Sequence, residues 1–332
     1  MRFVHNEGIT DPTINLAIEE YILTYLSAEE EPYLLFYINE PSIIIGKNQN
    51  TIEEINAPYV EEHGIHVVRR LSGGGAVYHD LGNLNYSFIT KNDPAVFNNY
   101  KTFTEPVIRA LQGLGVPAEL TGRNDIQAGS RKISGNAQFA SRGRMFSHGT
   151  LLFDSNMDEV VNALRVNPMK IESKGVKSVR SRVANITEFL DGPMTIEAFK
   201  QAIIDAIYAG QPVREYKLSA ADWERIRQIS EERYRSWDWN YGRSPRCNMT
   251  RTQRFEGVGI IDARLQIEEG AMQEVTFFGD FFGAGDVQEL AELLTGVPYR
   301  RDAIEAALAD VDLKRYFGNL EQEAFVSLLV LV

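Results

Sequence analysis

Two adjacent arginines, three consecutive glycines and a His-Asp pair lie close together in one stretch of this chain. The stretch reads Arg69-Arg70-Leu71-Ser72-Gly73-Gly74-Gly75-Ala76-Val77-Tyr78-His79-Asp80 and lies between two segments of strand-like pattern. Glycines let backbone N–H groups come close to a ligand, and guanidinium groups pair with phosphate or carboxylate oxygens. Three glycines alone would favour a hairpin turn. The charged residues on both sides favour an anion-binding loop.

A second segment places Lys132 at the start of an expected strand. A Gly-Ser turn signal precedes the Arg131-Lys132 pair, and Ile133-Ser134-Gly135 follows it. A strand can direct a lysine side chain into a cleft, although most lysines lie on exposed surfaces. These residues alone leave both interpretations open.

Four more blocks extend the pattern along the chain. They are residues 122–126, 148–152, 174–183 and 236–240, which begin Gly-Arg-Asn-Asp, His-Gly-Thr-Leu, Lys-Gly-Val-Lys and Ser-Trp-Asp-Trp. In this order, and together with the glycine loop and the Lys132 segment, they resemble the lipoate–protein ligases. The lipoate-binding loop of that family reads Arg-Arg-x-Ser-Gly-Gly-Gly-x-Val-(Phe/Tyr)-His-Asp.

The resemblance implies an ATP-dependent reaction in two steps. Free lipoate and ATP form lipoyl-AMP and pyrophosphate, and the amine of a carrier-protein lysine then displaces AMP. The implied cofactor is ATP with Mg²⁺, and the implied acceptors are lipoyl domains of 2-oxoacid dehydrogenases, the glycine-cleavage H protein, or both. Such an enzyme must stabilise negative charge at the α-phosphorus and at the carbonyl. It needs no nucleophile of its own, because the adenylate is already a good leaving group.

The same resemblance implies roles for individual residues. Lys132 is the implied catalytic residue, because an ammonium group can contact a carboxyl oxygen and an α-phosphate oxygen together. Asp125 is the candidate ligand for Mg²⁺, which prefers oxygen ligands. The implied ATP and adenylate contacts are Arg70, Gly75, Ala76, Val77, Tyr78, Asn83, Asp125, Lys132, Ser178 and Val179. The implied lipoate contacts are Ser72, Gly73, Gly74, Gly75, Lys132 and His148.

Several of these residues have a structural alternative. Val77 and Tyr78 can equally belong to a strand core, and an asparagine such as Asn83 often occupies a turn or cap. His79 and His148 can each hydrogen-bond a ligand or serve only the fold. The pattern identifies no base that deprotonates the acceptor lysine.

Two other functions fit part of the pattern. A lipoyl or octanoyl transferase of the same fold would move acyl groups between carrier proteins without ATP, and related transferases form a cysteine thioester. The single cysteine, Cys247, lies outside every matched block. A non-catalytic binder of carrier proteins would keep the fold, but Lys132 and the intact glycine loop argue against it.

Charge limits the other kinds of partner. The formal net charge of −12 argues against nucleic-acid binding, which relies on a broad basic face. Two basic islands are local exceptions, residues 123–148 and 170–182. Because both coincide with the matched blocks, we interpret them as walls of a phosphate-handling site.

Composition also limits location and metal chemistry. The chain lacks an apolar run near the ~20 residues of a membrane span, and its first residues lack a signal-peptide core. We therefore expect a cytoplasmic protein without membrane contact. The sequence leaves the oligomeric state open, and a monomer is the default expectation. One cysteine and five scattered histidines disfavour a disulfide framework and a structural zinc site.

A chain of 332 residues suggests two domains. We expect a lipoate- and ATP-binding catalytic domain over 1–242, a connector over 243–248 and an accessory domain over 249–332. The resemblance implies an α+β fold for the larger domain, related to biotin ligases and class II aminoacyl-tRNA synthetases. It implies a small α+β accessory domain for the rest.

Local patterns place the elements that would position these residues. Asp11 and Pro12 predict a helix start, and Thr51 with the glutamates after it predicts a capping box on a helix ending near Gly64. Further helices are expected over 104–114, 196–208, 220–234, 286–294, 302–308 and 320–329. Strands are expected over 34–38, 42–45, 83–89, 255–267 and 274–282, with a strand meander over 120–153.

Overall fold

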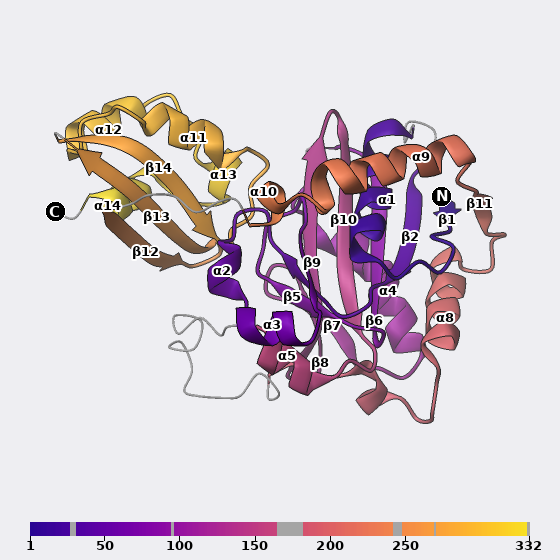
Figure 1. Ribbon diagram of the computed structural model, residues 1–332. Helices are drawn as coiled ribbons and strands as arrows, with labels where there is room; N and C mark the ends of the chain where they lie inside the picture. The colour runs from indigo at the N-terminus through magenta and orange to yellow at the C-terminus, as the bar shows by residue number, and fades with distance from the viewer. Residues whose placement is uncertain (27–30, 94–95, 165–181, 242–247, 269, 331–332) are drawn as a thin grey trace.

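The computed structural model describes residues 1–26, 31–93, 96–164, 182–241, 248–268 and 270–330. Figure 1 shows a large body that holds the N-terminus and a small body, coloured orange to yellow, that holds the C-terminus. Within the described ranges, the large body has an eight-stranded and a three-stranded sheet, and the small body has one three-stranded sheet. The mixture of sheets and covering helices confirms the predicted α+β class.

The large sheet has the strand order β11-β1-β2-β6-β10-β9-β8-β7. Antiparallel pairing runs from β2 through β6, β10, β9 and β8 to β7, which confirms the predicted meander. Strand β1 instead pairs in parallel with β2 and β11. The strands are β1 (Arg2–Val4), β2 (Tyr33–Ile38), β6 (Asn83–Lys91), β7 (Ala118–Thr121), β8 (Asp125–Ala128), β9 (Arg131–Ser141), β10 (Arg144–Leu152) and β11 (Arg214–Tyr216).

Helices cover both faces of this sheet (Figure 1). On β2, Leu34 and Phe36 belong to the core cluster that includes residues of α4 (Tyr100–Gly113) and α8 (Ile196–Tyr208). Leu35 and Tyr37 belong to the opposite cluster, with α1 (Pro12–Tyr25) and α9 (Ala220–Ile229). A strand buried on both faces reads as a continuous apolar run, which is why β2 shows no polar alternation.

Local capping chemistry sets the starts of three helices, which begin at or next to the predicted positions. The Asp11 carboxylate accepts from the Thr13 N–H at 2.8 Å at the start of α1. The Thr195 hydroxyl accepts from the Ala198 N–H at 3.2 Å before α8. Ser219 forms a capping box at α9, which continues as a π-helical turn over Ser230–Tyr234 and is followed by α10 (Trp237–Asn240).

The predicted helix from Thr51 to Gly64 is wrong in two respects. The chain forms two short helices, α2 (Thr51–Glu54) and α3 (Ala57–Glu62), because Pro58 has no N–H to continue the first. Thr51 is also no cap: it is the first residue of α2, and its hydroxyl contacts the Asn240 carbonyl and the Arg69 guanidinium.

The three-stranded sheet of the large body carries the glycine loop. Its strands are β3 (Ser42–Ile45), β4 (His66–Arg69) and β5 (Val77–His79), in the order β4-β3-β5. β3 is parallel to β4 and antiparallel to β5, so residues 70–76 connect the two outer strands. One apolar cluster packs this sheet against α3 and α5 (Met157–Ala163). The short helix η1 (Ile186–Phe189) belongs instead to the core cluster of the large sheet.

The small body has its own apolar core, in which Phe277, Phe317 and Phe325 pack together. The predicted strand over 274–282 is displaced: β14 ends at Gly279, Phe281 packs into the core of the small body, and the Phe282 ring contacts Gly74 of the large body. A membrane-crossing helix is not found in the described part of the chain. The elements are β12 (Met249–Phe255), β13 (Gly259–Glu268), β14 (Ala271–Gly279), α11 (Val287–Leu294), α12 (Arg301–Ala307), α13 (Lys314–Phe317) and α14 (Gln322–Leu329).

Candidate functional site

A cavity lies beside the glycine loop and faces the middle of the large sheet. Its walls come from α1, β2, β3, the glycine loop, β5, β6, β9, β10 and the small body. The lining residues are Leu16, Tyr37, Ile44, Arg70, Gly74, Gly75, Ala76, Val77, His79, Asn85, Asn124, Lys132, Gly135, Asn136, Ala137, His148, Gly149, Thr150 and Phe282. Apolar side chains therefore share the wall with two cationic side chains, Arg70 and Lys132.

Arg70 organises the glycine loop from inside. Its guanidinium donates to the carbonyls of Gly73 (2.7 Å) and Gly75 (2.9 Å), and its Nε donates to the Ser72 hydroxyl (3.0 Å). It also reaches the Ile44 carbonyl at 3.0 Å, which ties the loop to β3. Burial lowers the pKa of Arg70 to about 10, so the guanidinium stays charged at neutral pH on the cavity wall.

Arg69 does not serve the role that its position suggests. The side chain is fully buried, at 0% exposure. Its donors meet the carbonyls of Gly46, Lys47, Gln49, Trp239 and Asn240 and the Thr51 hydroxyl, at 2.7–3.2 Å. The prediction that both arginines offer charge to an anion is therefore wrong for Arg69, which instead ties α10 to residues 46–51.

Ser72 and His148 form a buried polar chain with Glu19 of α1. The Ser72 hydroxyl lies 2.7 Å from His148 Nε2, and His148 Nδ1 lies 3.0 Å from a Glu19 carboxylate oxygen. His148 lines the cavity, whereas Ser72 lies behind it at 1% exposure. Both ring nitrogens of His148 are thus engaged within the protein, and the chain holds the glycine loop against α1.

Lys132 lines the cavity from β9. Its Nζ lies 2.8 Å from the Asp125 carboxylate on the neighbouring strand β8, and both side chains are about one-third exposed (34% each). A bulge in the β8–β9 pairing sets Lys132 opposite Gln127. Asp125 is therefore adjacent to Lys132 but is not itself one of the lining residues. An ammonium group at this place can meet an anion in the cavity.

The remaining predicted residues divide into three groups. Gly74, Gly75, Ala76 and Val77 line the cavity, and Gly73 lies next to it with its carbonyl bound to Arg70. The structure does not bring Tyr78 and Asn83 to the cavity wall. Tyr78 points into the core between β3 and α3, because side chains alternate along β5. Asn83 is fully buried, and its side chain donates a hydrogen bond to Asn85. Ser178 and Val179 lie outside the described residues.

Sequence reasoning missed Phe282, the contribution of the small body to the cavity. The Phe282 ring packs on Gly74, edge-to-face on Tyr100, and under the Arg123 guanidinium at 4.2 Å. Arg123 also donates to the Gly257 and Val258 carbonyls. These contacts join residues that are more than a hundred positions apart, and no local pattern marks them.

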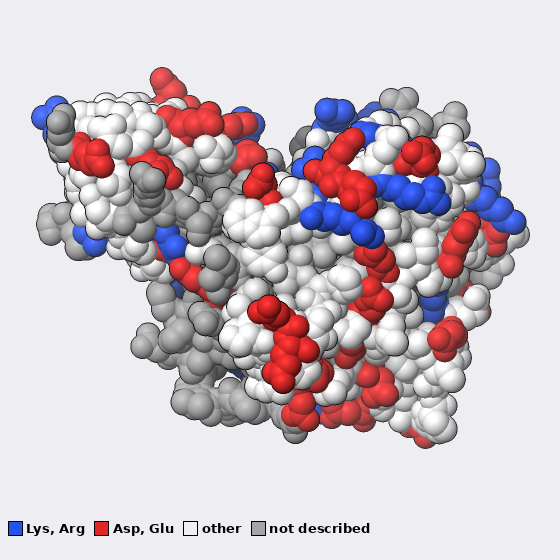
Figure 2. Space-filling view, viewed as in Figure 1, with Lys and Arg blue, Asp and Glu red and all other residues white. Residues whose placement is uncertain are grey.

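Only part of the first basic island, residues 123–148, contributes to the cavity wall. In the first island, Arg131 pairs with Glu188, Arg144 donates to the carbonyls of Leu23 and Leu26, and only Lys132 and His148 line the cavity. Residues 170–181 of the second island lie outside the described residues. Figure 2 shows acidic and basic side chains interleaved over α9, where ion pairs such as Arg225–Glu232 lie.

His79 is buried in the cavity wall at 4% exposure. Burial, followed by repulsion from Arg70 and His148, lowers the pKa of His79 from 6.5 to about 3. In the unfolded chain His79 therefore takes up a proton as the pH falls below 6.5, whereas in the folded protein it stays neutral down to about pH 3.

We therefore expect the free energy of unfolding to fall as the pH drops from 6.5 toward 3. His79→Gln should remove up to about 1.4 kcal/mol per pH unit of this slope, because it removes one titrating group. Urea denaturation at pH 7, 6 and 5 measures the slopes. Equal slopes in the wild type and in His79→Gln would contradict the assignment.

Comparison with known protein families covers both bodies. The family described as "Lipoyl protein ligase A/B catalytic domain" matches residues 11–208, and "Bacterial lipoate protein ligase C-terminus" matches residues 244–329. Lipoate-protein ligase LplJ of Bacillus subtilis is 60% identical over 332 residues, which cover 99% of this chain and 100% of that protein. Lipoate–protein ligase 1 of Staphylococcus aureus is 55% identical over 329 residues, with the same coverage of 99% and 100%.

Several solved structures of similar fold are lipoate–protein ligases. Plasmodium falciparum LipL1 in complex with lipoate shares the fold, with a TM-score of 0.79 over 98% of this chain and 97% of that one at 23% identity. A lipoate-protein ligase A bound with ATP is 30% identical with a TM-score of 0.62, and the match covers 73% of this chain and 98% of that one. A bipartite ligase with its E2 lipoyl domain, from Thermoplasma acidophilum, is also 30% identical, with a TM-score of 0.65. The match covers 75% of this chain and 98% of that one.

Both bodies thus have their counterpart in one family, and the two relatives share at least 55% of their residues with the chain along 99% of its length. That similarity agrees with a cavity built by the glycine loop, Lys132 and the small body. The chain belongs to the lipoate–protein ligase family.

Proposed function

We propose that this protein activates free lipoate with ATP and transfers the lipoyl group to a lysine of a lipoyl-carrier domain. One observation carries the proposal: a single cavity joins an apolar wall, a glycine loop and the cations Arg70 and Lys132. An acyl chain fits the apolar wall, and carboxylate and phosphate oxygens fit the cationic part. The ATP-bound and lipoate-bound relatives support this choice of ligands.

In the first step, a lipoate carboxylate oxygen attacks the α-phosphorus of ATP, and pyrophosphate leaves. Lys132 stands where its ammonium group can neutralise charge on the carboxylate and on an α-phosphate oxygen. We assign the nucleotide contacts to Arg70, Gly75, Ala76 and Val77 of the loop, whose shape Arg70 maintains. In the second step, the acceptor amine attacks the acyl carbonyl and AMP leaves, so Lys132 serves both steps.

Further contacts with lipoate and the nucleotide are assigned from the positions of the residues and from the family pattern. Ser72, Gly73, Gly74 and His148 border the lipoate position, through the loop and the Glu19 chain. For Tyr78 and Asn83, only a backbone contact or a rearrangement of the loop is compatible with their burial. The family pattern alone supports nucleotide contacts by Ser178 and Val179.

Mg²⁺ fits this site as a companion of the nucleotide. The described residues contain no cluster of three or more His, Cys, Asp or Glu side chains that could hold a metal by themselves. Asp125 supplies one carboxylate beside Lys132, which suits a cation that takes most of its ligands from phosphates and water. The ion would neutralise phosphate charge during activation.

The proposed partners are the lipoyl domains of 2-oxoacid dehydrogenases, the glycine-cleavage H protein, or both, with the ligase as a monomer. The archaeal relative described with its E2 lipoyl domain supports the first of these acceptors. The acceptor lysine must enter the same cavity, since the adenylate is formed there.

Lipoate-dependent exchange between ATP and labelled pyrophosphate tests the proposal. The ligase forms lipoyl-AMP reversibly and should show exchange only when lipoate is present. A transferase would show no exchange and would move acyl groups from one carrier to another. A binder that lacks catalysis would show neither reaction, and either result would refute the proposal.

We further propose that residues 1–242 are the catalytic domain, 243–248 a connector and 249–332 an accessory domain that serves activation. The separate core of the small body and its single ring in the cavity, Phe282, support this division.

A chain ending at Gly242 should therefore stay folded and accept supplied lipoyl-AMP, but form the adenylate at least tenfold more slowly. Loss of Phe282 uncovers Gly74 and leaves the glycine loop without its small-body contact. Separate assays of adenylation and of transfer from lipoyl-AMP measure the difference. Equal losses in both assays, in a truncated protein with intact near-UV circular dichroism, would contradict the assignment.

A further inference from the structure

His79 contributes an imidazole ring to the cavity wall. It follows Val77 on the same face of β5, and the apolar Leu16 and Ile44 line the same cavity. Its Nε2 atom is buried and has no hydrogen-bond partner among the residues that the structure describes. A buried polar atom without a partner is costly, and its place in a ligand cavity points to a ligand.

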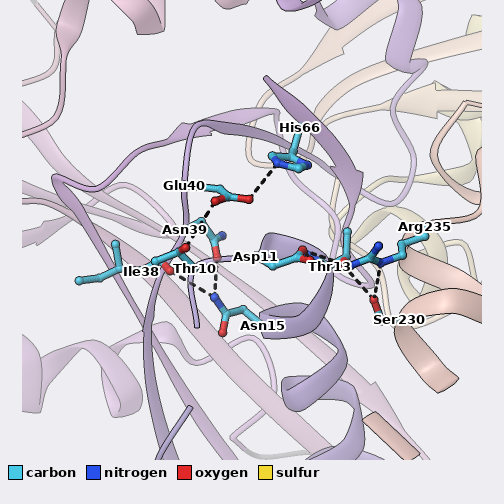
Figure 3. A network of polar contacts seen from close by, with 10 residues as sticks. All are labelled: Thr10, Asp11, Thr13, Asn15, Ile38, Asn39, Glu40, His66, Ser230 and Arg235. Atoms are coloured by element: carbon cyan, nitrogen blue, oxygen red, sulfur yellow. Dashed lines mark hydrogen bonds and ion pairs between the residues drawn. The ribbon is translucent and has the colours of Figure 1, made fainter. Parts of the chain in front are cut away.

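A chain of asparagines determines which nitrogen of His79 carries the proton. Asn15 Nδ2 donates to the backbone carbonyls of Ile9 (2.9 Å) and Ile38 (3.2 Å), which fixes the orientation of its amide. The same Nδ2 donates to Asn39 Oδ1 at 2.9 Å, as Figure 3 shows. Asn39 must therefore turn its Nδ2 toward His79, and the two atoms that meet there, Asn39 Nδ2 and His79 Nδ1, are 3.0 Å apart.

This geometry makes Nε2 of His79, a residue that lines the cavity, a hydrogen-bond donor. Because Asn39 Nδ2 can only donate, Nδ1 of His79 accepts. The lowered pKa keeps the ring neutral at physiological pH, so its one proton resides on Nε2. Asn6, which donates to Asn15 Oδ1 at 3.0 Å, extends the chain to the surface turn before α1.

His148, the other imidazole in the wall, differs in this respect. Its two nitrogens already meet Ser72 and Glu19. Its hydrogen bonds serve the glycine loop, whereas those of His79 leave one donor for a ligand. The two histidines are therefore not equivalent, although the sequence allows both the same roles.

We propose that the Nε2–H group of His79 donates to a sulfur atom of the lipoyl dithiolane ring and so favours lipoate over octanoate. The inference rests on the proposed function, which places the carboxylate near Lys132 and the far end of the acyl chain at the apolar wall. Both acids have an apolar chain and a carboxylate, but only lipoate carries acceptor atoms at its far end. Octanoate leaves the buried donor unpaired, and a site built around a donor rejects a ligand that lacks the acceptor.

The expected selectivity is modest, because sulfur is a weak acceptor. We expect His79→Leu to lose about 3–10-fold of the preference for lipoate, which corresponds to one weak hydrogen bond. Octanoate affinity should stay equal or rise, because the donor is no longer left unpaired. Calorimetric titration of the full chain with each acid measures the ratio of the two dissociation constants.

The matched control is His66→Leu. His66 and His79 lie on either side of Ser42 in the same sheet, but His66 is exposed and pairs with Glu40 (Figure 3). This variant should keep the wild-type ratio. If His79→Leu also keeps that ratio, or weakens both acids equally, the inference is wrong.

Imidazole NMR of the wild-type protein tests the same inference without a substitution, should the variant fold poorly. With ¹⁵N-labelled histidine, we expect the His79 proton on Nε2, and we expect lipoate but not octanoate to shift its resonance. A proton on Nδ1, or equal shifts with both acids, would overturn the inference. Binding of lipoate without ATP–pyrophosphate exchange would instead refute the proposed function and leave this contact intact.

Discussion

Lys132→Met should slow both half-reactions by about 10²–10³-fold, because it removes one preorganised charge from each transition state. Methionine roughly keeps the length of the side chain, so the β9 backbone and the glycine loop should keep their positions. Lipoyl-AMP formation and carrier lipoylation from supplied lipoyl-AMP measure the two steps separately. Lys132 lies in the cavity with Asp125 as its ion partner, which makes this charge the largest single contribution that we expect.

Two control variants sharpen this experiment. Lys91→Met removes an exposed lysine at the end of β6 and should leave both rates unchanged. Cys247→Ser should also leave both rates near wild type, because the ligase forms no thioester; Cys247 itself lies outside the described residues. A transferase would reverse the result, with acyl transfer lost in the cysteine variant. Near-normal ligation by Lys132→Met would refute our assignment of the catalytic residue.

Arg69→Met should cost about 3–5 kcal/mol in the free energy of unfolding, one of the largest effects that we expect for a single residue. The substitution leaves five carbonyl oxygens and the Thr51 hydroxyl without their buried donor. Those acceptors lie on residues 46–51 and on α10, so the attachment of α10 to the three-stranded sheet of the large body, β4-β3-β5, should loosen first. Urea denaturation measures the loss.

The matched control for Arg69 is Arg109→Met on α4. Arg109 is largely exposed and forms an i,i+4 ion pair with Glu105, so its loss should change stability by less than about 0.5 kcal/mol. A loss of less than about 1 kcal/mol in Arg69→Met would mean that water replaces the guanidinium. Lipoate binding by the folded fraction of Arg69→Met should persist, since Arg69 is not among the residues that line the cavity.

Short-range chemistry explains which parts of the fold were predictable. Asp11, Thr195 and Ser219 cap helices because their side chains reach backbone N–H groups two or three residues away. The meander from β7 to β10 follows from the glycines at its three turns, Gly122, Gly129 and Gly143, which all have positive φ. Such signals act within a few residues and can be read directly from the sequence.

The same short range explains the errors. At Thr51 the capping pattern is present, but a donor from Arg69 and a carbonyl from Asn240, far away in sequence, compete for the hydroxyl. The strand expected over 274–282 ends early because the Phe282 ring packs on Gly74, Tyr100 and Arg123 of the large body. Tertiary contacts overrode the local preference in both places.

The sequence by itself determined the chemical content of this protein: the family, the glycine loop, Lys132 and the caps that begin its helices. Only the tertiary structure decided how adjacent or similar residues divide their roles. Arg69 holds α10 while Arg70 shapes the loop, and His148 is engaged on both ring nitrogens while His79 keeps a free donor. The physical reason is that a side chain's role depends on which acceptors surround its donors, and those acceptors come from segments distant in the sequence.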